Sequence, residues 1–341
     1  MRVGIIGGGF GLNVQAPIIK MHPMLNLVAV STMFRHELPL ELIGEDNSPT
    51  HYRNWTEMLN NEELDLLFIS SMPIYHFQMV EYALKNGIKN IVCEKPFTLN
   101  SNESRQLLNL SEQYKAKVII DFEWRYLPIR QKAKELITNN NVGKLLHIDY
   151  NISHAQYQVL QTSKRGWMGE KQKFGGMLGA LGTHMIDCLR WLAQDEIVSI
   201  NGLVHTHVPI GAGEQRDADD AFFINGKMKK NSTFSVQLLT GINHGFGSHL
   251  KVFGDEGTVS LINDKQIFYG KAKEQLEEIV VPNPSEAPLH FSLEAKAYYP
   301  SFYPFIEKVY EYIVYNKPDK DLPLIEDGHE NQVVIKKILE I

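Results

Sequence analysis

Cysteine is scarce in this 341-residue sequence, and there is no excess of positive charge. Cys93 and Cys188 each lie in an apolar run, which argues against a disulfide framework and favours a reducing, cytoplasmic environment. The formal net charge is -6 and no basic stripe offsets it, so we expect no nucleic acid partner. No apolar run approaches the roughly 18 residues of a membrane span, and the first residues lack a signal-peptide core. We therefore expect no membrane partner.

Signatures of several other chemistries are also missing. The sequence has no Gly-x-Ser-x-Gly elbow, no Walker loop and no His-Glu-x-x-His pair. Its 13 histidines show no spacing that would complete a zinc site, because pairs such as His205 and His207 supply only two ligands. We expect no metal centre.

The length favours two domains, because one hydrophobic core usually stops growing at about 250–300 residues. Residues 1–122 alternate short β-branched runs with segments of helical period, which predicts an α/β domain with a doubly wound parallel sheet. Residues 123–341 predict an α+β domain with a large, mainly antiparallel sheet. The predicted strands are 3–6, 27–30, 66–71, 91–93, 118–122, 145–154, 197–205, 221–226, 232–240, 248–254 and 258–263. The predicted helices are 76–86, one from residue 100, 121–138, 175–192, 302–316 and 327–341, with a surface loop at 281–288.

A glycine cluster, Gly7-Gly8-Gly9-Phe10-Gly11-Leu12, directly follows the first predicted strand. A pyrophosphate needs a backbone that turns sharply and approaches it without Cβ atoms, and the following helix start offers N–H groups. A tight structural turn would also explain the glycines, but their place in a strand–helix alternation favours a dinucleotide-binding Rossmann domain. Gly7, Gly9, Phe10, Gly11 and Leu12 are the predicted contacts. Leu12 stands where a third glycine is usual, so we expect helix and strand to pack slightly further apart.

No acid follows the second predicted strand, where a carboxylate would hold the adenosine ribose. The residues there include Thr32 and Arg35, which can donate to a phosphate. Because a carboxylate would repel a 2′-phosphate, we expect the cofactor to be NAD(P), with NADP favoured. An Arg35 that points into solvent is an equally good interpretation.

Three further segments carry a resemblance to a known family. Residues 69–76 lie at the end of the predicted strand 66–71, Glu94-Lys95-Pro96 ends the next, and the glycine-rich segment 175–187 opens a helix of the second domain. In this order, and together with residues 253–258, they resemble the Gfo/Idh/MocA family of sugar and inositol dehydrogenases along nearly the whole chain.

The resemblance implies that Ser71, Pro73 and His76 line the cofactor. It also implies that Glu94 and Lys95 lie beside the nicotinamide ribose and the reacting carbon. Ligands of open α/β sheets bind at the carboxyl ends of the strands, which is where these residues fall. For His76, a histidine at a helix start that is satisfied by backbone groups is an equally good interpretation.

Lys95 and His184 are the predicted catalytic residues. Oxidation of an alcohol by hydride transfer needs a group that accepts or stabilises the hydroxyl proton, and Lys95 suits that role unless it is a surface lysine. In the resembled family an acid usually stands four residues before the histidine, where this chain has Ala180. Asp187 shares a helix face with His184 and is predicted to orient its ring or to contact the substrate, and a pairing with another residue is an equally good interpretation.

Trp124, Arg125 and Trp167 are predicted to lie near the substrate. The first two belong to residues 121–128, which resemble the segment that joins the two domains of the family, and both side chains suit polyhydroxylated ligands. Core packing explains Trp124 equally well. Trp167 lies in the long polar segment 161–174, a type of loop that often covers a site.

We therefore expect a dehydrogenase that moves hydride between NAD(P) and a secondary alcohol of a sugar, sugar derivative or cyclitol. The alternative is a cofactor-binding regulator or sensor of the same fold that has lost turnover, which Ala180 suggests. One face of the second sheet could pair with a copy of itself, as resembled proteins tend to do, so we expect a homodimer or homotetramer.

Overall fold

The structure is a computed structural model that describes residues 1–44, 48–282 and 286–340. The chain forms two compact units. The first consists of Met1–Tyr126 and Asn283–Gln332, and the second of Leu127–Pro282 and Val333–Ile341. The division expected from the sequence ends the first segment at residue 122 and does not include the return of residues 283–332 to the first unit.

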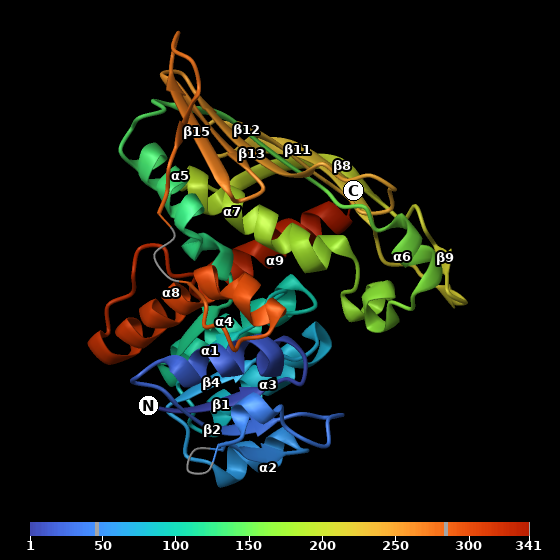
Figure 1. The fold of residues 1–341 in the computed structure, drawn as a ribbon, viewed down its shortest axis with the longest axis vertical. Helices are drawn as coiled ribbons and strands as arrows, with labels where there is room; N and C mark the ends of the chain where they lie inside the picture. The colour runs from blue at the N-terminus through green and yellow to red at the C-terminus, as the bar shows by residue number, and fades with distance from the viewer. Residues whose placement is uncertain (45–47, 283–285, 341) are drawn as a thin grey trace. The chain divides into compact units, whose positions relative to one another are not determined.

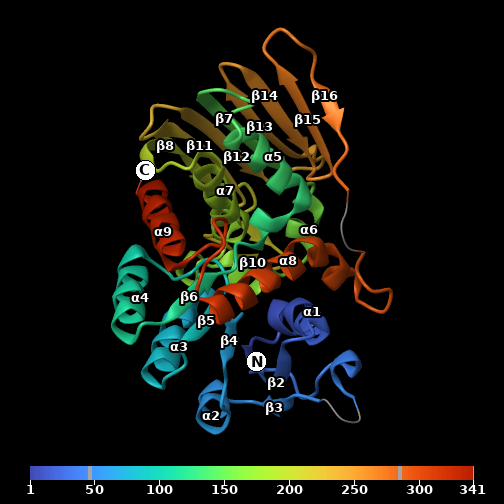
Figure 2. The same ribbon diagram turned by 90° about the vertical axis from the view of Figure 1, so that its left-hand side faces the viewer.

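The described residues of the first unit form a six-stranded parallel sheet in the order β3-β2-β1-β4-β5-β6 (Figure 2). Its strands are β1 (Arg2–Ile6), β2 (Asn26–Ser31), β3 (Thr50–Tyr52), β4 (Leu66–Ile69), β5 (Asn90–Cys93) and β6 (Lys117–Ile120). The doubly wound parallel sheet is confirmed. Only the three-residue edge strand β3 was not predicted, because it is too short and too exposed to show a pattern.

The helices of this unit are a π-helical turn (Gly11–Gln15) that runs into α1 (Ala16–Met21), α2 (Trp55–Asn61), α3 (Pro73–Lys85), α4 (Ser101–Tyr114) and α8 (Leu293–Tyr315). The predicted cap at Asn100 is present, since its side chain accepts from the N–H groups of Asn102 and Glu103. Helix α3 begins with Pro73, a residue that suits the first helical position.

The helix predicted over 302–316 begins nearer the N-terminus, with Ser292 as its cap. Prolines weaken a helix interior, and Pro300 and Pro304 both lie inside α8, which is why the pattern suggested a later start. The apolar face of α8, which includes Phe302 and Phe305, is fully buried in the core around α1. This burial outweighs the missing backbone hydrogen bonds.

The described part of the second unit contains an eight-stranded sheet in the order β16-β15-β14-β13-β7-β12-β11-β8. It is mostly antiparallel as predicted, although β7 and β12 pair in parallel. Its strands are β7 (Leu145–Ser153), β8 (Ile197–His205), β11 (Ala221–Met228), β12 (Thr233–Leu239), β13 (Gly247–Gly254), β14 (Gly257–Ile262), β15 (Gln266–Lys271) and β16 (Glu277–Ile279). A separate short pair consists of β9 (Ile210–Gly211) and β10 (Glu214–Gln215).

Helices α5 (Pro128–Thr138) and α7 (Thr183–Ala193) cover one face of this sheet (Figure 1). The last residues of α9 (Ile325–Leu339) join the same core through Val334, Ile335 and Ile338. A short helix, α6 (Tyr157–Thr162), precedes the loop that leads to α7. Every second residue of β7 is buried towards the helices, so the opposite sheet face remains partly exposed.

Two sequence predictions need correction here. The helix predicted over 121–138 is broken: a 3₁₀ turn spans Glu123–Tyr126, and α5 starts only at Pro128. Leu127 has an extended backbone because a residue before proline is disfavoured in a helix. The strands β15 and β16 were not predicted, and the loop predicted over 281–288 includes residues 283–285, which lie outside the described residues.

Candidate active site

The glycine loop, residues 7–11, lies at the carboxyl end of β1, and its glycines have two different structural roles. Gly7 has φ +152°, and a Cβ there would lie 2.3 Å from the Ser70 carbonyl oxygen. A Cβ at Gly11 would lie 3.0 Å from Ile5 and from Ser70. A Cβ at Gly9, in contrast, would meet no protein atom within 4 Å. Gly7 and Gly11 therefore let the loop pack on the sheet, whereas Gly9 leaves its outer side open.

This arrangement fits a dinucleotide. The helical run from Gly11 to Met21 follows the loop directly, so its first N–H groups and positive dipole end face the open side. Leu12 is fully buried and Phe10 packs edge-to-face on Tyr298 of α8, with ring centroids 4.8 Å apart. The packing of these two side chains holds the glycine loop in place.

The end of β2 carries donors rather than an acid. The Thr32 hydroxyl lies 2.7 Å from Nε2 of His51, a residue of β3. Arg35 donates to Asn13 at 3.0 Å, and Arg53 lies 2.9 Å from Nδ1 of His36. Burial and the charge of Arg53 lower the pKa of His51. His51 of β3 and Arg53, which directly follows β3, thus lie near the end of β2, and neither was predicted from the sequence.

Ser71, Pro73 and His76 lie where β4 passes into α3. His76 is fully buried, and its Nδ1 and Nε2 lie 3.0 Å from the carbonyl oxygens of Pro96 and Ser71. The ring thus lies between the segment after β4 and the Lys95–Pro96 segment. Burial lowers the pKa of His76, and a neutral imidazole donates a hydrogen bond to only one of these two carbonyl oxygens.

Glu94 and Lys95 directly follow β5. Glu94 is 7% exposed and its Oε2 accepts from the Lys95 backbone N–H at 3.1 Å. Burial raises the pKa of Glu94, while the charge of Lys95 lowers it. Both residues thus lie at the same sheet edge as the glycine loop and in the same compact unit, with β4 between β1 and β5.

A buried polar network connects these strand ends to the glycine-loop helix. The Gln15 amide Nε2 donates to Asp121 Oδ2 at 2.7 Å and lies 3.5 Å from Glu94 Oε1. The Ser70 hydroxyl donates to Gln15 Oε1. Asp121 directly follows β6 and is fully buried. Gln15 and Asp121 were not among the predicted site residues, although an acid directly after a buried strand is a usable signal.

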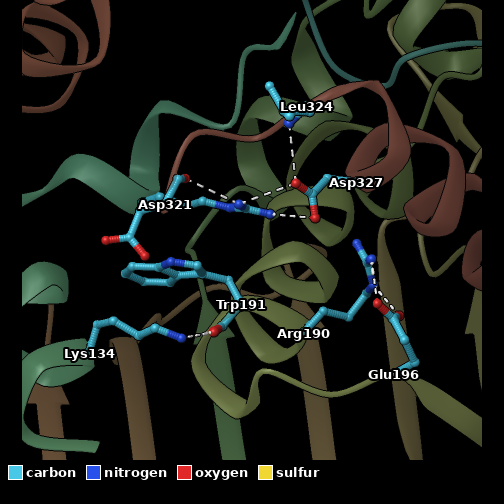
Figure 3. A network of polar contacts seen from close by, with 8 residues as sticks. Lys134, Arg190, Trp191, Glu196, Asp321, Leu324 and Asp327 are labelled. Atoms are coloured by element: carbon cyan, nitrogen blue, oxygen red, sulfur yellow. Dashed lines mark hydrogen bonds and ion pairs between the residues drawn. The ribbon is translucent and has the colours of Figure 1, made fainter. Parts of the chain in front are cut away.

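Arg125 and Trp124 belong to the 3₁₀ turn after β6. Arg125 is 5% exposed and donates to the Asp321 carbonyl oxygen at 3.2 Å. It also forms a 3.1 Å ion pair with Asp327, whose carboxylate accepts from the Leu324 N–H (Figure 3). Arg125 therefore fixes the segment that leads into α9, and Trp124 is partly exposed.

His184 and Asp187 lie on α7 in the second unit, where both are almost fully buried. A π-helical turn (Leu178–Gly182) runs directly into α7, and this helical run is held at both ends. At its start, Asp219 Oδ2 accepts from the N–H groups of Met177 and Leu178 at 3.0 and 2.8 Å. At its end, Lys134 donates to the Trp191 carbonyl oxygen and Arg190 binds Glu196 through two hydrogen bonds of 2.6 and 2.8 Å (Figure 3). The position of the His184 imidazole is thus fixed by the packing of its helix in the hydrophobic core of the second unit.

Trp167 lies in a 3₁₀ turn (Gly166–Gly169) of the loop before α7 and is partly exposed. The buried Arg216 donates to the carbonyl oxygens of Leu160, Ser163 and Gly211, which anchors the start of this loop. A pocket of about 260 Å³ lies beside the loop, and its lining includes Phe174, Leu203 and Asp219.

Within residues 1–44, 48–282 and 286–340, no group of three or more His, Cys, Asp or Glu side chains could hold a metal ion. In that same part of the chain, no helix is long and apolar enough to cross a membrane.

The doubly wound sheet, the open glycine loop and the Glu-Lys-Pro strand end define a nucleotide-binding oxidoreductase fold. The chain belongs to the Gfo/Idh/MocA family. Residues 1–122 match its oxidoreductase family model with an NAD-binding Rossmann fold, and residues 130–260 match its C-terminal domain.

Curated relatives and solved structures extend this result. An uncharacterized oxidoreductase of Synechocystis sp. is 26% identical over 309 residues, which are 86% of this chain and 82% of the relative. Glucose-6-phosphate 3-dehydrogenase of Bacillus subtilis is 26% identical over 70% of this chain and 67% of its own. The structure of levoglucosan dehydrogenase in complex with NADH and levoglucosan matches with a TM-score of 0.85 and 18% identity, over 100% of this chain and 96% of that one. At that identity the likeness is one of fold.

Proposed function

We propose that this oxidoreductase moves hydride between a nicotinamide cofactor and a secondary alcohol of a sugar, sugar derivative or cyclitol. The observation that best supports this proposal is the position of Glu94 and Lys95. They directly follow β5, which is separated from β1 only by β4, so they lie at the same sheet edge as the open glycine loop. The name of one similar protein, glucose-6-phosphate 3-dehydrogenase, supports the substrate class.

When bound, the cofactor supplies the ring carbon that exchanges hydride. The protein contributes the proton transfer: Lys95 takes the hydroxyl proton as hydride leaves the alcohol, and His184 assists it or binds the hydroxyl. Asp187 orients that histidine from the same helix, in place of the acid that Ala180 replaces. Trp124, Arg125 and Trp167 are proposed to shape the substrate pocket.

NADP is the proposed cofactor. Thr32 and Arg35 would bind the 2′-phosphate, and the structure adds His51 and Arg53 as nearby donors. A phosphate at this position would meet several donors and no acid from the end of β2.

The proposed assembly is a homodimer or homotetramer through the uncovered face of the eight-stranded sheet. Polar side chains such as Asp149, Ser235 and Lys251 connect neighbouring strands on that face. A cytoplasmic location is proposed because the sequence has only two cysteines, Cys93 and Cys188, and both lie in apolar runs.

The test combines binding and turnover. NADH and NADPH are titrated by fluorescence, and sugars and cyclitols are screened by absorbance of the reduced nicotinamide, with wild type, Lys95→Ala and the control Lys89→Ala. Lys89 is exposed and lies at the opposite end of β5, so its removal should change neither result. We expect Lys95→Ala to bind cofactor and to lose about 100-fold or more in turnover. Binding without turnover in wild type would contradict the dehydrogenase, and absence of binding would contradict the nucleotide site.

A further inference from the structure

Glu94 and Asp121 follow adjacent parallel strands at the same level. Cys93 of β5 pairs in register with Ile120 of β6, so the next residue of each strand lies opposite the other at the carboxyl edge. Neighbouring strands are only about 4.8 Å apart. Both carboxyl groups are removed from water, with exposures of 7% and 0%. Two full negative charges would repel each other strongly there.

The donors around the two carboxyl groups do not satisfy both as carboxylates. The Gln15 amide nitrogen donates to Asp121 Oδ2, and the Lys95 backbone N–H donates to Glu94 Oε2. Asp121 Oδ1 is buried and has no donor among the described residues. The Gln15 Nε2 also lies 3.5 Å from Glu94 Oε1, so one amide group reaches both carboxyl groups. A direct hydrogen bond between the two carboxyl groups requires a proton on one of them, because ionised carboxylates only accept.

We propose that Glu94 and Asp121 share one proton, so that together they carry one negative charge beside Lys95, and that Asp121 is the positioning residue that sets the charge of Glu94. The link to the nicotinamide rests on the proposed function. The proton itself follows from the geometry of the two strand ends.

The surroundings support a tightly held proton. Burial raises the pKa of both carboxyl groups, and the charges of Glu94 and Glu123 raise that of Asp121 further. Lys95 opposes the rise at Glu94. The other titratable groups that face the pair are the Cys93 thiol and the Tyr298 phenol, and burial raises the pKa of each. Near neutral pH these two groups therefore add no charge, and the pair gives up its shared proton at a higher pH than an isolated carboxyl group does.

The shared proton affects the two oxidation states of a nicotinamide differently. The oxidised ring is positively charged and the reduced ring is neutral, so loss of the proton favours the oxidised form. One unit charge at roughly 10 Å, with an effective dielectric constant of about 20, changes a binding constant roughly 10-fold. Asp121→Asn keeps the shape of the side chain but removes the shared proton. In this variant the ratio of the affinities for oxidised and reduced cofactor should no longer change with pH through this group.

The first experiment needs no cofactor. Infrared spectra of the cofactor-free protein are recorded at neutral pH for wild type, Asp121→Asn and the control Glu112→Gln, which removes an exposed carboxylate of α4. We expect the wild-type-minus-Asp121→Asn difference to contain the C=O band of a protonated carboxyl group, and the control difference to lack it. A difference spectrum without this band, from folded proteins, would overturn the proposal.

The second experiment measures dissociation constants of the oxidised and reduced cofactor from neutral to alkaline pH. Lys95→Met is the background, since it removes the lysine's own titration. The preference for the oxidised form should rise roughly 10-fold with pH in Lys95→Met and stay level in Lys95→Met/Asp121→Asn. Equal profiles for the two variants would overturn the charge control by Asp121. Failure of any cofactor to bind would instead contradict the proposed function, and the infrared result would still decide whether the proton is shared.

Discussion

Gly7 and Gly9 lie two residues apart in one loop, yet alanine should act on them in opposite ways. Gly7 has φ +152° and would place a Cβ 2.3 Å from the Ser70 carbonyl oxygen. At Gly9 no protein atom lies within 4 Å of the same added carbon. The first substitution therefore tests the fold, and the second tests whether a ligand occupies the open side of the loop.

For Gly7→Ala the expected loss in free energy of unfolding has two parts. A backbone conformation unsuited to an L-residue costs roughly 1–3 kcal/mol. Forcing a methyl group against a backbone carbonyl costs roughly 1–3 kcal/mol more. Gly87→Ala is the matched control, because Gly87 has φ +86° but open surroundings. We expect the control to lose only the first part, so Gly7→Ala should be the less stable variant in chemical denaturation.

For Gly9→Ala the free energy of unfolding should stay within about 0.5 kcal/mol of wild type. Its methyl group would project into the space proposed for the pyrophosphate, so cofactor affinity should fall about 10-fold or more, equivalent to about 1.4 kcal/mol. Fluorescence titration with NADH and NADPH measures this loss. Wild-type affinity in a stable Gly9→Ala protein would refute the proposed position of the pyrophosphate. Wild-type stability in Gly7→Ala would refute the packing argument.

Three other substitutions test separate parts of the structure. Arg35→Ala should weaken NADPH binding about 10-fold and leave NADH binding nearly unchanged, since only NADPH carries the 2′-phosphate; equal losses would contradict that role. Burial raises the pKa of Asp219 from 3.8 to about 6, so wild type should lose up to about 3 kcal/mol of stability as pH rises through this interval. Asp219→Asn should not show that loss in denaturation at several pH values, and a parallel pH profile would refute the assignment. Arg130→Leu removes a buried partner of Asp264 and should lower the free energy of unfolding by about 3–5 kcal/mol, whereas the double variant with Asp264→Leu should recover part of it.

The elements predicted best from the sequence are those whose residue pattern is set by one physical factor, burial. The inner strands of the first sheet are buried on both faces, so each reads as a short apolar run bounded by polar residues or glycine. The β7–β12 pair shows the limit of this reasoning. Alternating burial marks a strand with one covered face, but the pattern is the same for parallel and antiparallel neighbours.

The candidate site divides in the same way. Glycines after a first strand and Glu-Lys-Pro after a later one are local signals, so Gly7, Gly9 and Lys95 could be named from the sequence alone. Gln15 and Tyr298 acquire their positions only in the folded unit, through contacts with residues 106 positions and 288 positions away in the chain. Nothing local distinguishes them from other helical residues.

The two glycine-rich segments illustrate why a motif must be tested by its surroundings. Added Cβ atoms at Gly175, Gly176, Gly179 and Gly182 would each meet protein at 3.0 Å or less, against the preceding loop, Asp219, Phe174 and Phe222. No opening comparable to the one at Gly9 exists at these four positions. These glycines therefore let the loop and the capping carboxylate pack tightly on the start of α7, and they do not cradle a ligand. Substitutions there should affect His184 through its position and through stability, whereas Gly9 is the glycine whose substitution should be sensed directly by the cofactor.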